Sequence, residues 1–292
     1  MEKPLGDLPI SRRNSMKPIV AIMYDFDKTL STKDMQEYAF IPGIGMTAEE
    51  FWGACNRLTK ENSMDQILSY MYVMLSEARG KKLLNRTEFN KLGESVELCP
   101  GVSDWFERVN TYGESIGVTV EHYIISSGVK EIIEGTPIAK YFKEIYAAEF
   151  LYDSDGVPVW PAMAVNYTSK TQFLFRINKG VLDVTEHREL NTYTAEEERR
   201  VPFSNMIYIG DGFTDVPCMK LVKVNGGHSV AVYSTDDDTA HKIMEQGRVD
   251  YVAKTDYRKG EKLETTVFSI LDLIKANHIT TQIKISDKKR TR

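Results

Sequence analysis

Two aspartates stand two residues apart directly after an apolar segment, and their side chains could do chemistry together. Asp25 and Asp27 follow Ile19-Val-Ala-Ile-Met-Tyr24, a run that is typical of a buried strand. Open α/β sheets bind ligands in the crevice at the carboxyl ends of their strands. A pair of carboxylates in that position can supply a nucleophile and a proton donor, or oxygen ligands for a metal ion.

A second acidic motif repeats this arrangement far along the chain. The apolar segment 206–209 is followed by Gly210-Asp211-Gly212, and Asp215 comes four residues after Asp211. Asp-Gly sequences are also typical of turns, and acids at strand ends often cap helices. Each motif alone has that simpler interpretation, whereas the two motifs in this order favour a catalytic site.

Two further segments contain residue types that bind phosphate. The segment Ile124-Ile-Ser126-Ser127-Gly128 is predicted to present hydroxyls and backbone N–H groups at a strand end, just before a helix, where anions bind. A serine in that position could instead cap the helix. Lys170 begins a predicted helix after Asn166-Tyr-Thr-Ser169. Taken alone, such a lysine is usually solvated.

The elements that would position these residues alternate between strand and helix, which predicts an α/β fold with a parallel sheet and helices on both faces. A hairpin is predicted over 146–166, with its turn at Asp153-Ser-Asp-Gly156. Further strands are predicted over 118–125, 206–209, 229–232 and 251–253, and helices over 129–134, 170–177, 216–222, 239–246 and 263–277.

The segment between the first acidic motif and residue 100 is helical in pattern and has no strand signal. Thr47-Ala-Glu-Glu50 and Ser63-Met-Asp-Gln66 both match the capping box that begins helices. Apolar residues from Met64 to Ala78 recur on one helical face. We interpret this segment as a helical insertion. In the polar stretch 182–200, Thr194-Ala-Glu-Glu197 predicts the start of another, charged helix.

Composition restricts the class of protein. The 292 residues are 42% apolar and 27% charged, which is ordinary for a soluble globular protein of about two domains. The net charge of −5 gives no overall basic surface, so we expect no nucleic-acid partner. The three cysteines and five histidines show no metal-ligand spacing. No signal peptide or membrane span is predicted, so we expect a cytoplasmic protein.

With the four motifs in this order, the chain resembles the haloacid dehalogenase superfamily, and within it the phosphoserine-phosphatase-like phosphatases. The family pattern D-x-D-x-T falls on Asp25, Asp27 and Thr29. The strand ending in Ser or Thr falls on Ser126, with Ser127 as the other register, and the family lysine falls on Lys170. The pattern G-D-G-x-x-D begins at Gly210.

The resemblance implies a Rossmann-like core with a helical cap inserted between the first two motifs. It therefore divides the chain into an N-terminal extension, a discontinuous core, a cap and a basic tail. These parts are residues 1–17, residues 18–31 with 99–280, residues 32–98, and residues 281–292.

The resemblance also implies the role of each site residue. Asp25 would attack phosphorus and form an aspartyl-phosphate, and Asp27 would act as the general acid and base. Mg²⁺ would be held by the carboxylates of Asp25 and Asp211 and by the backbone carbonyl of Asp27. Asp215 would support the metal site or orient Lys170. The phosphate would be bound by Ser126 or Ser127, Lys170 and Thr214.

Substrate selection is expected to depend on the cap. Asp34 stands nine residues after Asp25, where phosphoserine phosphatases carry a glutamate, and it would contact the substrate or merely cap a helix. No arginine occurs between Ser63 and Ala78 to bind a substrate carboxylate. A helical cap over the site favours a small phosphorylated metabolite as substrate.

Other functions are compatible with the same motifs. A phosphotransferase or phosphomutase would pass the phosphoryl group from Asp25 to an alcohol instead of water. A non-catalytic binding module on this scaffold would normally have lost an acid or the lysine, and this chain keeps Asp25, Asp27, Lys170 and Asp211. Hydrolysis without an added alcohol would distinguish the phosphatase from the phosphotransferase.

Overall fold

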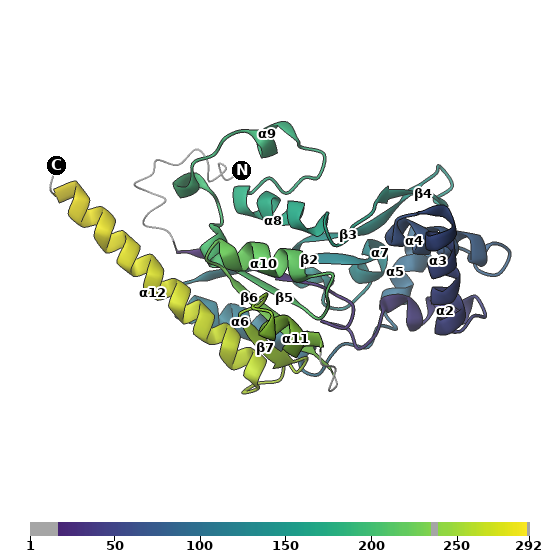
Figure 1. The fold of residues 1–292 in the computed structure, drawn as a ribbon, viewed down its shortest axis with the longest axis horizontal. Helices are drawn as coiled ribbons and strands as arrows, with labels where there is room; N and C mark the ends of the chain where they lie inside the picture. Colours follow the sequence, from purple (N-terminus) through teal and green to yellow (C-terminus); the bar gives the residue numbers. More distant parts are fainter. Residues whose placement is uncertain (1–16, 235–238, 291–292) are drawn as a thin grey trace.

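A computed structural model describes residues 17–234 and 239–290 (Figure 1). A seven-stranded sheet runs through the molecule in the order β4-β3-β2-β1-β5-β6-β7. All neighbouring strands are parallel except β3 and β4, which form the predicted hairpin. The strands are β1 (Ile19–Tyr24), β2 (Thr119–Val129), β3 (Phe142–Tyr152), β4 (Pro158–Met163), β5 (Met206–Gly210), β6 (His228–Tyr233) and β7 (Tyr251–Lys254).

Alternate side chains of the central strand reach opposite faces of the sheet, because the side-chain period of a strand is two. Val20, Ile22 and Tyr24 of β1 join one hydrophobic cluster, whereas Ala21 and Met23 join another. The first cluster is covered by α6 (Val102–Ser115), α7 (Lys130–Glu134) and α12 (Lys262–Arg290), and the second by α8 (Lys170–Lys179), α10 (Val216–Val224) and α11 (Thr239–Glu245). The predicted α/β fold is therefore confirmed.

A block of helices lies at one end of the sheet, near β4 (Figure 1). It contains the 3-10 turn η2 (Met35–Glu37) and the helices α2 (Phe40–Gly43), α3 (Ala48–Asn62), α4 (Gln66–Ala78) and α5 (Arg86–Gly93). Phe89 of α5 stacks on Phe150 of β3, so the block shares an apolar cluster with the core. The division of the chain into core and cap stays a prediction.

Local capping explains where two of these helices begin. Thr47 and Glu50 form the predicted capping box of α3. The second predicted box is wrong: Ser63 ends α3 in a left-handed conformation, and the carboxylate of Asp65 caps α4 by accepting from the N–H groups of Ile67 and Leu68. Asp is as good an N-cap as Ser, so the motif contained two candidate start points two residues apart.

Two other predictions about helices are wrong. The polar stretch 182–200 forms only α9 (Arg188–Asn191) and the 3-10 turn η4 (Glu196–Glu198), because no apolar face is available to dock a longer helix. The last helix does not end at Asn277 but includes most of the predicted basic tail. No Gly or Pro stands between residues 262 and 290 to end it. The predicted extension 1–17 lies outside the described residues except for Lys17.

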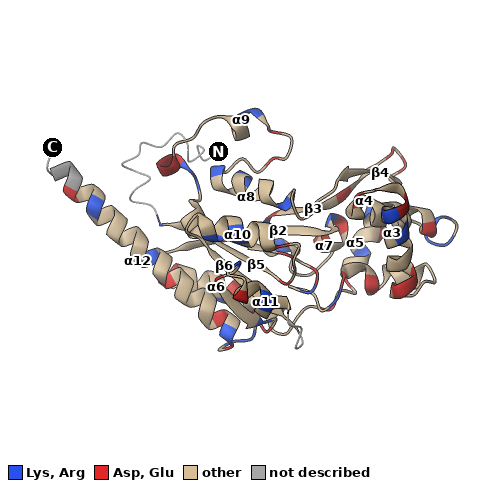
Figure 2. Cartoon of the chain, viewed as in Figure 1, with Lys and Arg blue, Asp and Glu red and all other residues tan. Residues whose placement is uncertain are grey.

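Acidic and basic residues are interspersed over the helices in the view of Figure 2. Among residues 17–234 and 239–290, no helix combines the length and apolar character needed to cross a bilayer.

Two glycines let α5 and α7 approach each other at backbone distance. A Cβ at Gly93 would lie 2.3 Å from the carbonyl oxygen of Ile132, and a Cβ at Gly135 would lie 1.7 Å from that of Asn90. Backbone atoms cannot move aside as a flexible side chain can. This contact fixes the helical block against α7, the helix that follows the Ser126–Gly128 segment.

Gly135→Ala should therefore lower the free energy of unfolding by roughly 1–3 kcal/mol or more, the usual effect of overpacking. Gly53→Ala is the control, because a Cβ there meets only the Arg57 side chain at 3.7 Å. A glycine in a helix interior costs about 0.5–1 kcal/mol relative to alanine, so the control should stabilise. Urea denaturation measures both. Equal changes in the two variants would contradict the close contact.

Candidate active site

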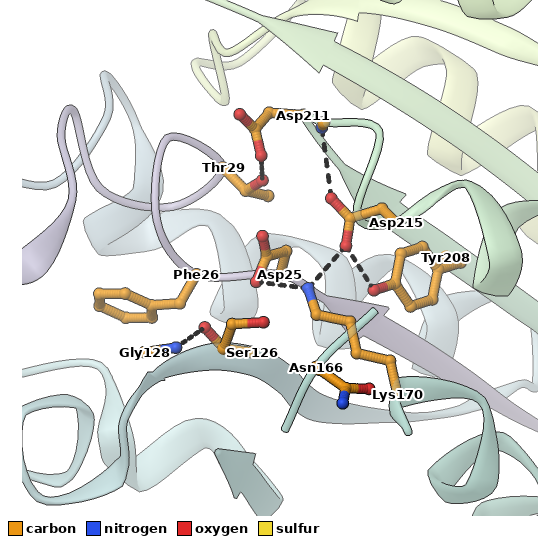
Figure 3. Close-up of polar contacts among 12 residues, drawn as sticks. Asp25, Phe26, Thr29, Ser126, Gly128, Asn166, Lys170, Tyr208, Asp211 and Asp215 are labelled. Atoms are coloured by element: carbon orange, nitrogen blue, oxygen red, sulfur yellow. Dashed lines mark hydrogen bonds and ion pairs between the residues drawn. The ribbon is translucent and has the colours of Figure 1, made fainter. Parts of the chain in front are cut away.

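Parallel strands bring the predicted catalytic motifs to one edge of the sheet. β1 lies between β2 and β5, so their carboxyl ends, which carry Asp25, Ser126 and Asp211, are neighbours. The backbone N–H of Asp25 donates to the carbonyl of Ile209 at 2.9 Å and extends this pairing past the end of β1. Figure 3 shows the three side chains converging with Lys170.

Lys170 is fully buried at the start of α8, and its ammonium lies between two carboxylates (Figure 3). Nζ is 3.0 Å from Oδ1 of Asp25 and 2.8 Å from Oδ1 of Asp215. Burial lowers the pKa of Lys170, but the charges of Asp215 and Asp25 outweigh it and raise the pKa above the ordinary value. Lys170 is thus a fixed cation beside the predicted nucleophile.

Asp215 is held by three donors, one of which is Lys170. Its Oδ1 accepts from Lys170 and from the Tyr208 hydroxyl, both at 2.8 Å, and its Oδ2 accepts from the N–H of Gly212 at 3.3 Å. A Cβ at Gly210 would lie 2.5 Å from the carboxyl carbon, so only glycine lets Asp215 approach β5 this closely. Of the two predicted roles for Asp215, these contacts support the orientation of Lys170.

Three carboxylates gather at this edge. Oxygens of Asp25, Asp211 and Asp215 lie within 4.8 Å of one another. Burial and the charge of Asp215 raise the pKa of Asp25 to about 6, against the opposing charge of Lys170. Burial and the same carboxylate, with Asp25, raise the pKa of Asp211 to about 8. An all-oxygen, negatively charged set of this kind fits a hard cation such as Mg²⁺.

Asp27 lies in a different environment from Asp25. Its Oδ1 accepts from the N–H of Met35 at 2.8 Å. Burial raises the pKa of Asp27 well above its ordinary value, and the charges of Asp34 and Asp25 add to this, although the Met35 bond and Lys28 oppose it. A raised carboxyl pKa favours the protonated form, which is the form that a general acid needs.

The predicted phosphate-binding strand end is a bulge. β2 pairs Ile125 with Tyr146 and then Val129 with Ala148, so the segment 126–128 leaves the regular ladder. Such bulges redirect backbone and side chains beside active sites. Ser126 is buried and its Oγ accepts from the N–H of Gly128 at 3.0 Å, whereas Ser127 is half-buried.

The other two predicted residues lie at the margin of the site. Thr214 is exposed in the turn after β5, and no hydrogen bond joins its side chain to the acids within the described part of the chain. Asp34 precedes η2, but its side chain caps nothing there. Its Oδ2 accepts from Nζ of Lys28 at 2.7 Å. The expectation that Asp34 might simply cap a helix is therefore wrong.

Three residues at the site were not predicted. Tyr208 holds Asp215, the N–H of Met35 holds Asp27, and Asn166 shapes the turn before Lys170. Tyr208 looks like one more apolar residue of a buried strand, and a backbone N–H leaves no mark in a sequence. Asn166 offered a signal, because Asn with Thr and Ser two and three residues later is typical of a turn.

This chain belongs to the haloacid dehalogenase-like hydrolase family, whose model matches residues 22–220. It is also 29% identical over 280 residues to an uncharacterized protein of Borreliella burgdorferi, a match that covers 86% of this chain and 95% of the relative. The matched range includes Asp25, Ser126, Lys170 and the Asp211–Asp215 motif, so the predicted family is confirmed.

Solved structures show the same fold at low sequence identity. A haloacid dehalogenase family hydrolase from Salmonella enterica serovar Typhi has a TM-score of 0.55 and 16% identity, and the match covers 87% of this chain and 72% of that one. A substrate-bound phosphoserine phosphatase has a TM-score of 0.53 and 14% identity, over 81% and 93%. The predicted Rossmann-like fold is confirmed by these matches.

The carboxylate cluster predicts how stability depends on pH in metal-chelating buffer. The pKa of Asp25 rises from 3.8 to about 6 on folding, so between these values the folded protein holds a proton that the unfolded chain releases. The free energy of unfolding should therefore fall as pH rises through this window. Asp25 should contribute roughly 3 kcal/mol to this fall in the free energy of unfolding, since each unit between the folded and unfolded pKa values corresponds to about 1.4 kcal/mol.

Asp25→Asn should remove this contribution and make the profile less steep between about pH 4 and pH 6, where Asp211 and Asp27, whose pKa values are also raised, still contribute. Urea denaturation at several pH values measures the slope. Asp155→Asn, an exposed change in the β3–β4 turn, is the control and should keep the wild-type slope. A profile that falls as steeply in Asp25→Asn as in the wild type would contradict the assignment.

Proposed function

We propose that this protein is a Mg²⁺-dependent phosphatase that hydrolyses a small phosphorylated metabolite through an aspartyl-phosphate. One observation carries the proposal: a fully buried lysine bridges Asp25 and Asp215, with Asp211 beside them, where three parallel strands end. A cation beside carboxylates that could hold a metal ion suits a ligand of high negative charge, such as a phosphoryl group.

Asp25 is the proposed nucleophile. One carboxylate oxygen attacks phosphorus while the bond from phosphorus to the substrate oxygen breaks, and the phosphoryl group passes to Asp25. Lys170 fixes the carboxylate from one side, because its Nζ lies 3.0 Å from Oδ1. The same ammonium lies where it can stabilise charge that builds on the phosphoryl oxygens. Ser126 and the N–H groups after it would bind those oxygens too.

Asp27 is the proposed general acid and base. Its raised pKa favours the protonated form before the reaction, from which it can donate a proton to the departing alkoxide. The resulting carboxylate then accepts a proton from water as the water attacks the aspartyl-phosphate. This second step releases inorganic phosphate and restores both acids. The Met35 N–H holds the Asp27 side chain through both steps.

Mg²⁺ would be held by the carboxylates of Asp25 and Asp211 and by the backbone carbonyl of Asp27. It would supply positive charge that offsets the repulsion between the Asp25 carboxylate and a phosphate dianion. Thr29 donates to Asp211 at 3.5 Å and so helps to orient that carboxylate. Asp215, with both oxygens already bonded, acts through Lys170.

The substrate is proposed to be small, because the helical block 32–98 would cover the site. Similar solved structures include phosphoserine phosphatases, but α4 of this chain lacks an arginine for a substrate carboxylate. Asp34, paired with Lys28 and close enough to influence Asp27, is the residue we propose for substrate selection. A hydroxyl or amine beside the phosphate would suit its carboxylate.

Asp25→Asn should leave the fold intact and reduce the release of phosphate from p-nitrophenyl phosphate to below about 1% of the wild-type rate, because loss of a nucleophile costs many orders of magnitude. Circular dichroism confirms folding, and Asp155→Asn should keep full activity as the matched control. More than about 1% activity in a folded variant would exclude Asp25 as the nucleophile.

A panel of phosphorylated metabolites, assayed with excess chelator and then with added Mg²⁺, tests the reaction and the metal together. Phosphate release should vanish in chelator and return with Mg²⁺. Asp211→Ala should raise the Mg²⁺ concentration needed for half-maximal rate at least tenfold, since it removes one of the carboxylate ligands. Undiminished activity in chelator would rule out the metal, and no release from any compound would reject the phosphatase.

A further inference from the structure

One helix of the inserted block touches both segments that are proposed to hold the phosphate. The Tyr70 hydroxyl of α4 donates to the carbonyl of Ser127 at 2.6 Å. At the start of the same helix, Oδ2 of Asp65 accepts from the side-chain amide of Asn166 at 3.1 Å. Ser127 adjoins Ser126, and Asn166 begins the turn that leads to Lys170, so α4 reaches both segments through two separate hydrogen bonds.

Tyr70 is built into this position. Only 4% of it is exposed, and its ring packs edge-on against Trp52 with centroids 6.3 Å apart. The Trp52 indole N–H donates to Oε1 of Glu37 at 2.8 Å. Glu37 belongs to η2, the turn whose Met35 N–H holds Asp27. Tyr70 is thereby connected to the segment that positions the proposed general acid.

Met35 connects the proposed general acid to the bulge of β2. Its N–H donates to Asp27, and its sulfur accepts from the N–H of Val129, at the end of the bulge that contains Ser126. A Cβ at Gly128 would lie 2.0 Å from the Met35 methyl carbon, so this packing is close. Met35 therefore contacts the bulge at Gly128 and Val129, and Tyr70 contacts it at the carbonyl of Ser127.

Asp65 is suited to a double role. Oδ1 caps α4 by accepting from Ile67 and Leu68, which leaves Oδ2 for Asn166. Asn166 uses its own Oδ1 to accept from the N–H of Ser169, and its backbone carbonyl accepts from the N–H of Lys170 at 2.9 Å. A shift of Asn166 would therefore be passed directly to the start of α8 and to Lys170.

We infer that Tyr70 and Asp65 are positioning residues, through which α4 sets the geometry of the two phosphate-binding segments. This inference rests on the proposed function for the identity of the ligand. Neither residue needs to touch the substrate, because each acts through a neighbour: Tyr70 through Ser127, and Asp65 through Asn166. Small displacements of such groups have large effects on rate, since transfer requires the reacting atoms to be closely aligned.

Tyr70→Phe removes one hydroxyl and keeps the ring against Trp52. Loss of one hydrogen bond should raise the inhibition constant of inorganic phosphate, measured against p-nitrophenyl phosphate, roughly three- to tenfold. Amide hydrogen exchange should become faster in residues 126–129. Tyr72→Phe, on the same helix but 57% exposed, is the matched control and should change neither quantity.

Asp65→Asn tests the second contact without removing the helix cap, since Asn caps helices as well as Asp does. A single oxygen must then serve both the cap and Asn166, so the bridge to Asn166 should be lost. Exchange should become faster over 166–171 and the inhibition constant of phosphate should rise. In the double variant of Asp65→Asn and Tyr70→Phe, the inhibition constant of phosphate should rise by less than the product of the two single increases. Both contacts act through the same helix, so their effects are coupled.

Distinct results separate this inference from the proposed function. Unchanged exchange in both segments and an unchanged inhibition constant, relative to Tyr72→Phe, would overturn the inference even if the wild type is an active phosphatase. If the wild type neither releases phosphate nor binds it, the proposed function fails. The exchange data would then still decide whether α4 holds the two segments. Equal loss of protection throughout the chain would show a structural role only and would also overturn the inference.

Discussion

A buried ammonium between two buried carboxylates is the interaction on which the site depends. Lys170 is fully buried, and the attraction of Asp25 and Asp215 compensates for the loss of its hydration. Removing Lys170 would leave two buried carboxylates without a counter-charge, and removing either carboxylate would leave Lys170 with one partner instead of two. Tyr208 and the Gly212 N–H complete the arrangement by bonding the oxygens of Asp215.

Burial raises the pKa of both aspartates of the first motif, and their charged neighbours make them different. Asp25 faces Lys170, which limits the rise of its pKa to about 6. Asp27 faces Asp34 and Asp25 across the start of the helical block, and its pKa rises well above the ordinary value. Lys170 thus favours the anionic form of Asp25, and the neighbouring acids favour the protonated form of Asp27, which is the division that nucleophilic attack and proton donation require.

Particular residues show how far the sequence was informative about structure. The strands and the helices around the sheet were predictable, because their apolar periods are unambiguous and turn residues separate them. The start of α4 was not, since Ser63 and Asp65 are both good N-caps and only the packing of the helix selects Asp65. The length of α12 was missed because an exposed polar sequence without Gly or Pro is compatible with helix and with coil.

By itself the sequence determined the family and its set of reactive groups. Carboxylates after apolar strands, a serine at a strand end and one lysine can be read directly, because motif spacing is a local property. Only the tertiary structure decided how these groups are held: that Asp215 pairs with Lys170, that Asp34 pairs with Lys28, and that α4 contacts both proposed phosphate-binding segments. Those contacts join residues far apart in the chain, and their partners are a backbone carbonyl, a turn amide or a buried tyrosine. Such groups carry no pattern in a sequence, so their pairing is set by the packing of helices on the sheet.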